Sequence, residues 1–211
     1  MRKIKAPFIF EKKFYNWNMS NNIFYFIRHA ETQKDSSVPS IRWGLSDAGE
    51  KQSQEIAIAN TFNTIDIIIS SEEEKAYATV KFLAGKLEKN VLRMSEFNEM
   101  VRGEKFLSKE EFEKLKREKL EDLDCKKDGG ESGREALARF ENGIKELDDA
   151  YENKTIMIAS HGTVLALYFA KLGNTWNDIY TRWSRTGFCA WGRVADGVVE
   201  RDVTNRDELY K

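Results

Sequence analysis

The fold of this chain is decided by residues 22–32, which read NIFYFIRHAET. The stretch starts with a short run of aromatic and β-branched residues without polar alternation, which is typical of a strand buried on both faces. A second stretch of the same kind, residues 155–163, reads TIMIASHGT. We therefore predict buried strands over residues 22–28 and 155–159. Each is followed closely by a histidine, His29 in the first case and His161 in the second.

Helix and strand patterns alternate along the rest of the chain. Ser46, Ser108 and Ser132 each precede a helical pattern and can cap its first turn. Glu111 and Glu135 complete capping boxes with the last two serines. The predicted helices cover residues 46–61, 73–86, 108–123, 132–151 and 163–172, and the other predicted strands cover residues 65–70, 91–94, 187–194 and 198–203.

This alternation predicts the fold class. Strands joined by helices form right-handed βαβ units, which build a mostly parallel, buried sheet. The dipeptide Asp196-Gly197 between the last two strands is a hairpin signal, so those strands should form an antiparallel edge. We expect an α/β fold: a three-layer sandwich in which helices cover both faces of the sheet.

Length and composition indicate one domain. The chain has 211 residues, of which 41% are hydrophobic and 33% are charged, and this suffices for a single core. We place the domain at residues 19–211, starting at Met19. Residues 1–18 are basic and aromatic but lack the continuous apolar run of a signal peptide, which indicates an N-terminal extension. Translated upstream sequence, an extra strand or a partner-binding arm are the alternatives for this segment.

Charge and cysteine content limit the kinds of binding partner and the cellular compartment that we expect for this chain. Lys and Arg number 34 and Asp and Glu 35, so there is no strong basic field and we expect no nucleic-acid partner. No segment approaches the roughly 18 apolar residues of a membrane-spanning helix, so we expect no membrane partner. Cys125 and Cys189 are far apart in sequence and fit free thiols better than a disulfide, which predicts a reducing, cytoplasmic location.

His29 and His161 are the only two histidines in the chain. Ligands of open α/β sheets bind outside the carboxyl ends of the strands, so both imidazoles should lie at the functional edge. Two unrelated core histidines are the alternative, but matching strand-end positions favour a site. Two histidines and distant cysteines fit no zinc spacing, and we expect no metal or other cofactor.

The residues next to His29 indicate an anionic substrate. The chain has no Gly-x-Ser-x-Gly elbow, no Walker A motif and no dinucleotide fingerprint. Arg28 directly precedes His29, and a planar guanidinium matches phosphate oxygens. A neutral imidazole can attack phosphorus, so a phosphoryl-transfer site is the hypothesis that the residues favour.

Several motifs together resemble those of the histidine phosphatase superfamily, which includes cofactor-dependent phosphoglycerate mutase. Residues 28–32 (RHAET) resemble its signature, and residues 160–162 (SHG) resemble its second histidine motif. Residues 45–52, 70–79 and 129–132 are similar to segments that the family has in between. The resemblance runs from residue 22 to residue 194 with all elements in order.

The resemblance implies a role for each site residue. His29 would attack phosphorus and become phosphohistidine, while Arg28 and His161 would hold the phosphoryl oxygens. Glu99 lies where the family has the carboxyl group that protonates the leaving oxygen, with Glu96 and Glu104 as nearby rivals. Lys75 takes the place of a second arginine. The residues expected to contact the substrate are Thr32, Ser36, Arg42 and Gly162.

The chain departs from the family pattern at the expected phosphate site. Lys75 binds phosphate without the bidentate fork of arginine. Asp35 stands where many members have a phosphate-binding Asn; it could pair with a base and leave Ser36, Ser37 or Arg42 to touch the ligand. The acidic run of residues 72–74 suits the first turn of a helix, where the macrodipole favours negative charge.

The predicted activity is hydrolysis of a small phosphomonoester. A mutase is one alternative, but the Arg-His-Tyr-Gly segment of mutases is absent after Glu99, where Val101-Arg102-Gly103-Glu104 stands. A non-catalytic phosphate-binding module is the other alternative, and Lys75 and Asp35 support it. Residues 102–128 are expected to recognise the substrate. The sequence leaves the substrate and the oligomeric state open.

Overall fold

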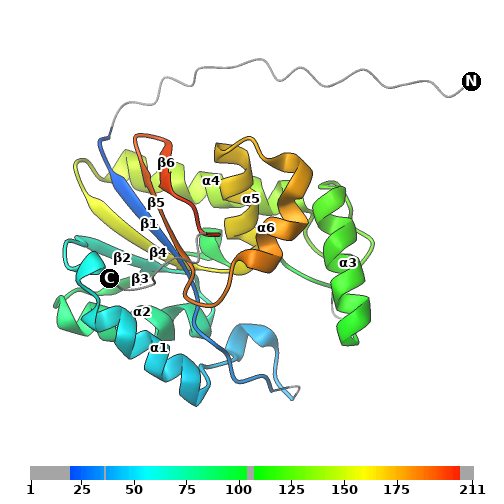
Figure 1. Ribbon diagram of the computed structural model, residues 1–211, viewed down its shortest axis with the longest axis horizontal. Helices are drawn as coiled ribbons and strands as arrows, with labels where there is room; N and C mark the ends of the chain where they lie inside the picture. Colours follow the sequence, from blue (N-terminus) through cyan, green and yellow to red (C-terminus); the bar gives the residue numbers. More distant parts are fainter. Residues whose placement is uncertain (1–19, 36, 104–106, 205–211) are drawn as a thin grey trace, which may run out of the picture.

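A computed structural model describes residues 20–35, 37–103 and 107–204. The expected N-terminal extension, residues 1–18, lies outside the described residues. The described part is a three-layer α/β sandwich, in which a central sheet lies between two helical layers (Figure 1). The predicted fold class is therefore confirmed.

The sheet has six strands in the order β3-β2-β4-β1-β5-β6. β1 (Ile23–Arg28) pairs in parallel with β4 (Thr155–Ser160), which pairs in parallel with β2 (Ile67–Ser70), and β2 pairs in parallel with β3 (Val91–Arg93). β5 (Trp191–Ala195) runs antiparallel to β1 and to β6 (Val198–Arg201). The mostly parallel sheet thus ends in the predicted antiparallel edge.

The two central strands bury both of their faces. In β1, Phe24 and Phe26 point into one hydrophobic core, whereas Tyr25 and Ile27 point into the core on the opposite face. Side chains alternate between the faces of a strand, so a strand covered on both sides needs an unbroken apolar run. This explains why residues 23–27 show no polar alternation.

Helices cover the two faces unequally. α1 (Asp47–Ile58) and α2 (Glu74–Lys86) cover one face (Figure 1). α4 (Gly133–Ala150), α5 (Gly162–Leu172) and α6 (Ile179–Arg185) lie on the other side, and α3 (Lys109–Glu121) lies outside them against α6 (Figure 1). Short 3₁₀ turns are η1 (Ser40–Arg42), η2 (Asn60–Phe62), η3 (Ser95–Phe97) and η4 (Trp176–Asp178).

The helix starts follow the predicted caps. The Ser46 hydroxyl accepts a hydrogen bond from the backbone N–H of Gly49 at the start of α1. Both predicted capping boxes are present, at the starts of α3 and α4. These bonds satisfy N–H groups that a helix leaves unpaired in its first turn, and each cap is typically worth about 1 kcal/mol.

The sequence prediction differs from the structure at two places near the C-terminus. Helix α6 was missed, because it has only seven residues and is too short to show a clear period. The strand predicted over residues 187–194 begins only at Trp191. Residues 187–190 form a turn in which Cys189 has a φ of 55°, and this turn places Phe188 beside His29.

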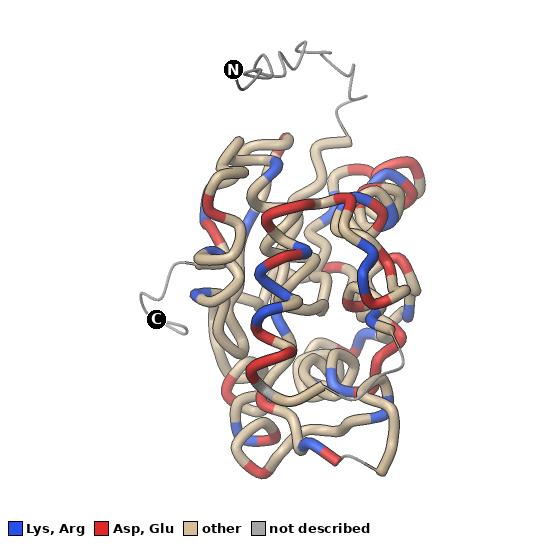
Figure 2. Tube along the Cα trace, turned by 90° about the vertical axis from the view of Figure 1, so that its right-hand side faces the viewer, with Lys and Arg blue, Asp and Glu red and all other residues tan. Residues whose placement is uncertain are grey.

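Neither a disulfide nor a spanning helix occurs in the described part. Cys125 and Cys189 are both buried and are not joined to each other. No helix there is both long and apolar enough to cross a bilayer. Acidic and basic residues are interspersed along the chain, as seen on the side that carries α3 (Figure 2).

Candidate active site

The two histidines leave the ends of neighbouring parallel strands. Arg28 at the end of β1 is in register with Ser160 at the end of β4, and the backbone N–H of His29 donates to the Ser160 carbonyl at 2.9 Å. The His29 and His161 rings lie with their centroids 5.2 Å apart. The pairing of β1 with β4 therefore brings together two residues that are 132 positions apart in sequence.

The His29 ring is held as a neutral imidazole with a defined tautomer. Its Nδ1 lies 2.8 Å from the carbonyl oxygen of Ala30. A carbonyl only accepts, so Nδ1 carries the proton and Nε2 keeps its lone pair. Burial, His161 and Arg28 hold the pKa of His29 well below its usual range. An unprotonated Nε2 of this kind can act as a nucleophile.

His161 is arranged to donate a hydrogen bond to a ligand. Ser71 Oγ accepts from the N–H of Glu73 at 3.2 Å and lies 2.7 Å from His161 Nε2. When the Ser71 hydroxyl donates to Nε2, the ring proton is on Nδ1 and can be given to a ligand. Nδ1 is buried and has no hydrogen-bond partner among the described residues. Burial lowers the pKa of His161 to about 3, with Glu99 opposing and Lys75 and Arg28 adding to the effect, so the ring is neutral near pH 7.

Arg28 is fixed at the same edge by three neighbours. One terminal guanidinium nitrogen donates to the Thr186 carbonyl, and the guanidinium carbon lies 4.7 Å from the centre of the Phe188 ring. Gly162, the first residue of α5, lets the arginine pack against the helix, since a Cβ there would lie 3.2 Å from the guanidinium carbon. Arg28 Nε is buried without a partner in the described part of the chain.

These unpaired donors indicate an anion site. Buried polar atoms in native proteins are almost always hydrogen-bonded, so an exception points to a missing ligand. Arg28 Nε and His161 Nδ1 are two such donors, on the two residues that flank the site of His29. A tetrahedral oxyanion could accept from both while its central atom faces Nε2 of His29.

Lys75 reaches the same edge from the first turn of α2 but is already paired. It is only 6% exposed. Its ammonium donates to the Ser40 carbonyl at 2.8 Å and forms an ion pair with the Glu73 carboxylate. The prediction that residues 72–74 simply favour the helix dipole is incomplete, because Glu73 turns inward, whereas Glu72 and Glu74 are exposed.

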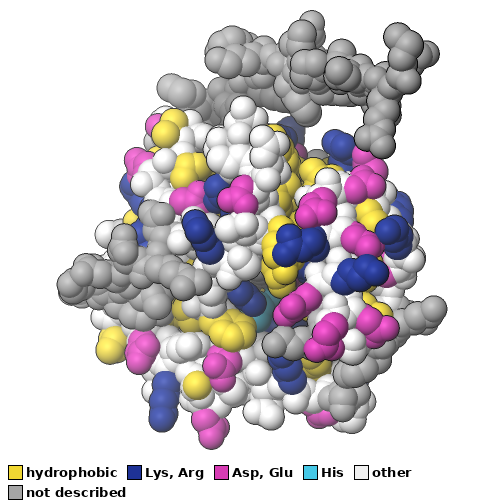
Figure 3. Space-filling view, turned by 45° about the vertical axis from the view of Figure 1, so that its right-hand side comes forward, with side chains coloured by type: hydrophobic (Ala, Val, Ile, Leu, Met, Phe, Trp, Pro, Cys, Tyr) yellow, Lys and Arg dark blue, Asp and Glu magenta, His cyan; other side chains and the backbone are white. Residues whose placement is uncertain are grey.

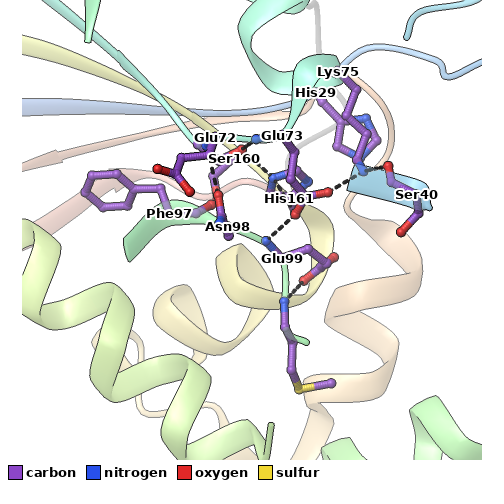
Figure 4. Close-up of polar contacts among 12 residues, drawn as sticks. His29, Ser40, Glu72, Glu73, Lys75, Phe97, Asn98, Glu99, Ser160 and His161 are labelled. Carbon is purple, nitrogen blue, oxygen red and sulfur yellow. Dashed lines mark hydrogen bonds and ion pairs between the residues drawn. The ribbon is translucent and has the colours of Figure 1, made fainter. Parts of the chain in front are cut away.

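Glu99 approaches the histidines from the loop after η3 (Figure 4). One carboxylate oxygen accepts from the N–H of Met100 at 2.8 Å, and the other accepts from the N–H and hydroxyl of Thr163 at 3.2 and 3.0 Å. Burial opposes ionisation, but Lys116, His161 and these donors outweigh it and lower the pKa of Glu99 to about 2. The free site therefore holds Glu99 as a carboxylate.

Lys116 of α3 completes a polar chain to this carboxylate. Its Nζ donates to Thr163 Oγ1 at 2.8 Å, and the same hydroxyl bonds Glu99. The side chain is 4% exposed and lies over the rings of Phe112 and Trp183. Burial lowers the pKa of Lys116 to about 8, partly offset by Glu99. The ammonium thus stabilises the charged form of Glu99 through Thr163.

Arg139 of α4 holds the loop that carries Glu99. Its guanidinium donates to four carbonyl groups of this loop (Ser95, Glu96, Asn98 and Glu99, at 3.1, 2.7, 3.1 and 3.4 Å) and pairs with the Glu131 carboxylate. Ser160 Oγ adds a bond to the Phe97 carbonyl at 2.7 Å. The loop that carries Glu99 is therefore anchored to the sheet and to α4.

The remaining predicted site residues have other contacts, or lie outside the described part of the chain. Thr32 forms an isolated antiparallel bridge with Leu45. Arg42 is exposed and lines a surface pocket with Glu72 and Glu74. Asp35 forms no ion pair with a base among the described residues; it accepts from the N–H and hydroxyl of Ser37. Ser36 and the rival acid Glu104 lie outside the described residues.

Sequence reasoning missed four residues of the site: Glu73, Lys116, Arg139 and Thr163. Thr163 could have been found, because it follows the second histidine motif at the start of a helix. Lys116 and Arg139 had no distinguishing signal, since each stands in a helix with many other charged residues. Only the packing of α3 and α4 against the site selects them.

The space-filling view shows a histidine at the bottom of a hollow surrounded by basic, acidic and hydrophobic side chains (Figure 3). The Arg102 guanidinium donates to Ser40 Oγ at 3.4 Å, and its central carbon lies 5.1 Å from the centre of the Phe112 ring. Within the described residues no group of three or more His, Cys, Asp or Glu side chains is placed to hold a metal ion.

Several solved structures of phosphatases resemble this chain in fold. Solved structures with the same fold include a mycobacterial glucosyl-3-phosphoglycerate phosphatase, with 19% identity and a TM-score of 0.66 over 81% of this chain and 88% of that one. A mutant phosphoserine phosphatase from Entamoeba histolytica in complex with phosphoserine has 23% identity and a TM-score of 0.67, covering 82% and 89%. A putative α-ribazole-5'-P phosphatase from Escherichia coli has 22% identity and a TM-score of 0.67, covering 87% and 96%.

No curated protein matched this chain in sequence. The family model for the histidine phosphatase superfamily (branch 1), by contrast, matches residues 24–191, which include both histidine motifs and every strand up to the start of β5. The chain belongs to the histidine phosphatase superfamily.

Proposed function

We propose that this protein is a phosphatase that hydrolyses a small phosphomonoester through a phosphohistidine at His29, with Glu99 as proton donor. One observation carries the proposal. The unprotonated Nε2 of His29 lies in a site where the neighbouring residues Arg28 and His161 have buried donors without partners.

The first step forms the phosphoenzyme. Nε2 of His29 attacks phosphorus while the bond from phosphorus to the ester oxygen breaks. Glu99 gives its proton to the leaving oxygen, so an alcohol departs. Arg28, His161 and the third N–H of Lys75 stabilise the negative charge that spreads over the phosphoryl oxygens.

The second step returns the enzyme to its starting state. Glu99, now a carboxylate, takes a proton from water, whose oxygen attacks phosphorus. The phosphorus–nitrogen bond breaks, its electron pair stays on Nε2, and inorganic phosphate leaves. The proton is on Glu99 at the end of this step and passes to solvent when the phosphate departs, because the free site holds Glu99 as a carboxylate.

The proton on Glu99 must enter with the substrate in each turnover, because the carboxylate is ionised in the free site. A phosphomonoester has a second pKa of about 6, so its monoanion brings one proton. The negative phosphoryl group then lies close to Glu99 and favours the protonated acid. Hydrolysis should therefore be faster at acidic to neutral pH than at alkaline pH.

A phosphomonoester panel tests the proposed function. We expect the purified chain to hydrolyse several phosphomonoesters and to be inhibited by vanadate, which adopts the geometry of the phosphoryl transition state. Each substrate should release one inorganic phosphate per alcohol, measured by a phosphate assay. If no member of the panel is hydrolysed and neither vanadate nor phosphate binds, the proposal is wrong.

Replacing Lys116 with methionine should shift the pH dependence of turnover. The ammonium of Lys116 favours the carboxylate form of Glu99, so its loss raises the pKa of Glu99. Turnover requires protonated Glu99 in the complex and falls as pH rises through that pKa. The descending limb of the kcat profile should therefore move to higher pH, by about one unit.

The other charged groups around Glu99, which are Glu73, Arg28 and Arg139, stay in place in this variant, as does the neutral His161. Lys114→Met is the matched control, because Lys114 lies on the same helix but is exposed. Its kcat profile should coincide with that of the wild type. If the descending limb of the kcat profile does not move in Lys116→Met, Lys116 does not control the protonation of Glu99.

A further inference from the structure

Glu73 is a carboxylate placed inside the anion site. The residue is 6% exposed. One of its oxygens forms the ion pair with Lys75. The other accepts from the backbone N–H of Glu99 at 2.8 Å and lies 3.4 Å from His161 Nε2. Figure 4 shows Glu73 between Lys75, His161 and Glu99. Burying a carboxylate is costly unless it is paired, and here its partners are the Lys75 ammonium and the backbone N–H of Glu99.

The helix dipole does not explain this position. Glu73 is the residue before the first turn of α2, and its side chain makes no capping hydrogen bond. Its neighbours behave as ordinary acidic residues of a helix start, since Glu72 and Glu74 are exposed and Glu74 pairs with Arg93. Only the middle residue of the run turns toward the histidines.

The pairing limits what Lys75 can offer a phosphoryl group. A lysine ammonium has three N–H donors. The Ser40 carbonyl and the Glu73 carboxylate take two of them, so one remains. The negative charge of Glu73 also offsets the positive charge of Lys75, and it repels phosphoryl oxygens at short range.

The same carboxylate supports the proton donor. It accepts the N–H of Glu99, and the N–H of Glu72 donates to Asn98 Oδ1 at 2.8 Å. The start of α2 and the Glu99 loop are thereby joined at two points. Glu73 therefore acts on phosphate binding through Lys75 and on the acid through the backbone of Glu99.

We propose that Glu73 is a positioning residue that weakens phosphate binding at Lys75 while it holds the Glu99 loop in place. The inference rests on the proposed phosphatase function. Its consequence is a site that releases inorganic phosphate readily, so that the product inhibits little.

Two substitutions separate the two effects. Glu73→Gln removes the charge but keeps an oxygen that can accept the N–H of Glu99, so phosphate and vanadate should bind at least about fivefold more tightly. Glu73→Leu removes charge and acceptor together. It should also bind phosphate more tightly, but its kcat should be lower than that of Glu73→Gln because the Glu99 loop loses a bond.

The experiment measures phosphate affinity by calorimetry, vanadate inhibition, and kcat and KM for one substrate. Glu72→Gln is the matched control, with the same change in net charge on an exposed neighbour, and should alter phosphate affinity less than about twofold. A double-mutant cycle with Lys75→Met tests whether Glu73 acts on phosphate through Lys75. The increase in phosphate affinity caused by Glu73→Gln should largely vanish when Lys75 is replaced.

The outcomes distinguish the inference from the function on which it rests. If the wild type hydrolyses phosphomonoesters but Glu73→Gln binds phosphate no more tightly, the inference is wrong and the function stands. An equal gain in Glu72→Gln, or an undiminished gain in the Lys75→Met background, also overturns it. Absence of both hydrolysis and phosphate binding in all variants overturns the function and the inference together.

Discussion

Replacing His29 with alanine should lower kcat by at least about 10⁴-fold, as expected when the nucleophile of a covalent mechanism is removed. Without Nε2 no phosphoenzyme can form, and Arg28, His161 and Lys75 are left to bind substrate without reacting with it. We expect vanadate affinity to fall less than kcat, because those groups remain. The measurement is steady-state hydrolysis of the best substrate from the panel.

Trapping of the intermediate makes this prediction specific. Wild-type protein mixed with substrate and quenched rapidly in base should carry phosphate on His29, detected by mass spectrometry, and the alanine variant should carry none. Thermal unfolding of both proteins shows whether the variant is folded. A folded His29→Ala protein that retains a tenth of the wild-type activity would mean that another group attacks phosphorus.

Replacing Glu99 with glutamine should lower kcat for an alkyl phosphate by about 10²- to 10⁴-fold, the usual contribution of general acid catalysis. The amide keeps the shape of the side chain but cannot protonate the leaving oxygen. An aryl phosphate with an acidic phenol needs little protonation, so its hydrolysis should fall much less. The measurement compares kcat for both substrates in the wild type and the variant.

Glu96 supplies the matched control for this comparison. It lies in the same segment and was one of two rival candidates in the sequence, and Arg139 donates to its carbonyl as it does to that of Glu99. Glu96→Gln should leave both rates within about twofold of the wild type. An equal loss for alkyl and aryl substrates in Glu99→Gln would show that Glu99 is not the proton donor.

Local sequence patterns were sufficient for most of the fold. The unbroken apolar run of residues 23–27, the β-branched run of residues 67–69 and the serine caps each act over a few neighbouring residues. Their effects are therefore visible without knowledge of the rest of the chain. The strand over residues 187–190 was mispredicted because the left-handed backbone at Cys189 is set by packing, and not by a residue type that favours it.

The sequence by itself determined the two buried strands and the edge at which His29 and His161 stand, because apolar runs and strand ends are local features and parallel strands share a carboxyl edge. Only the tertiary structure decided the surroundings of that edge. It turned Glu73 inward to Lys75, brought Lys116 through Thr163 to Glu99, and set the tautomer of His29. Such contacts join residues from separate elements, and burial makes their charges strong enough to shift pKa values, so no neighbouring pattern in the sequence encodes them.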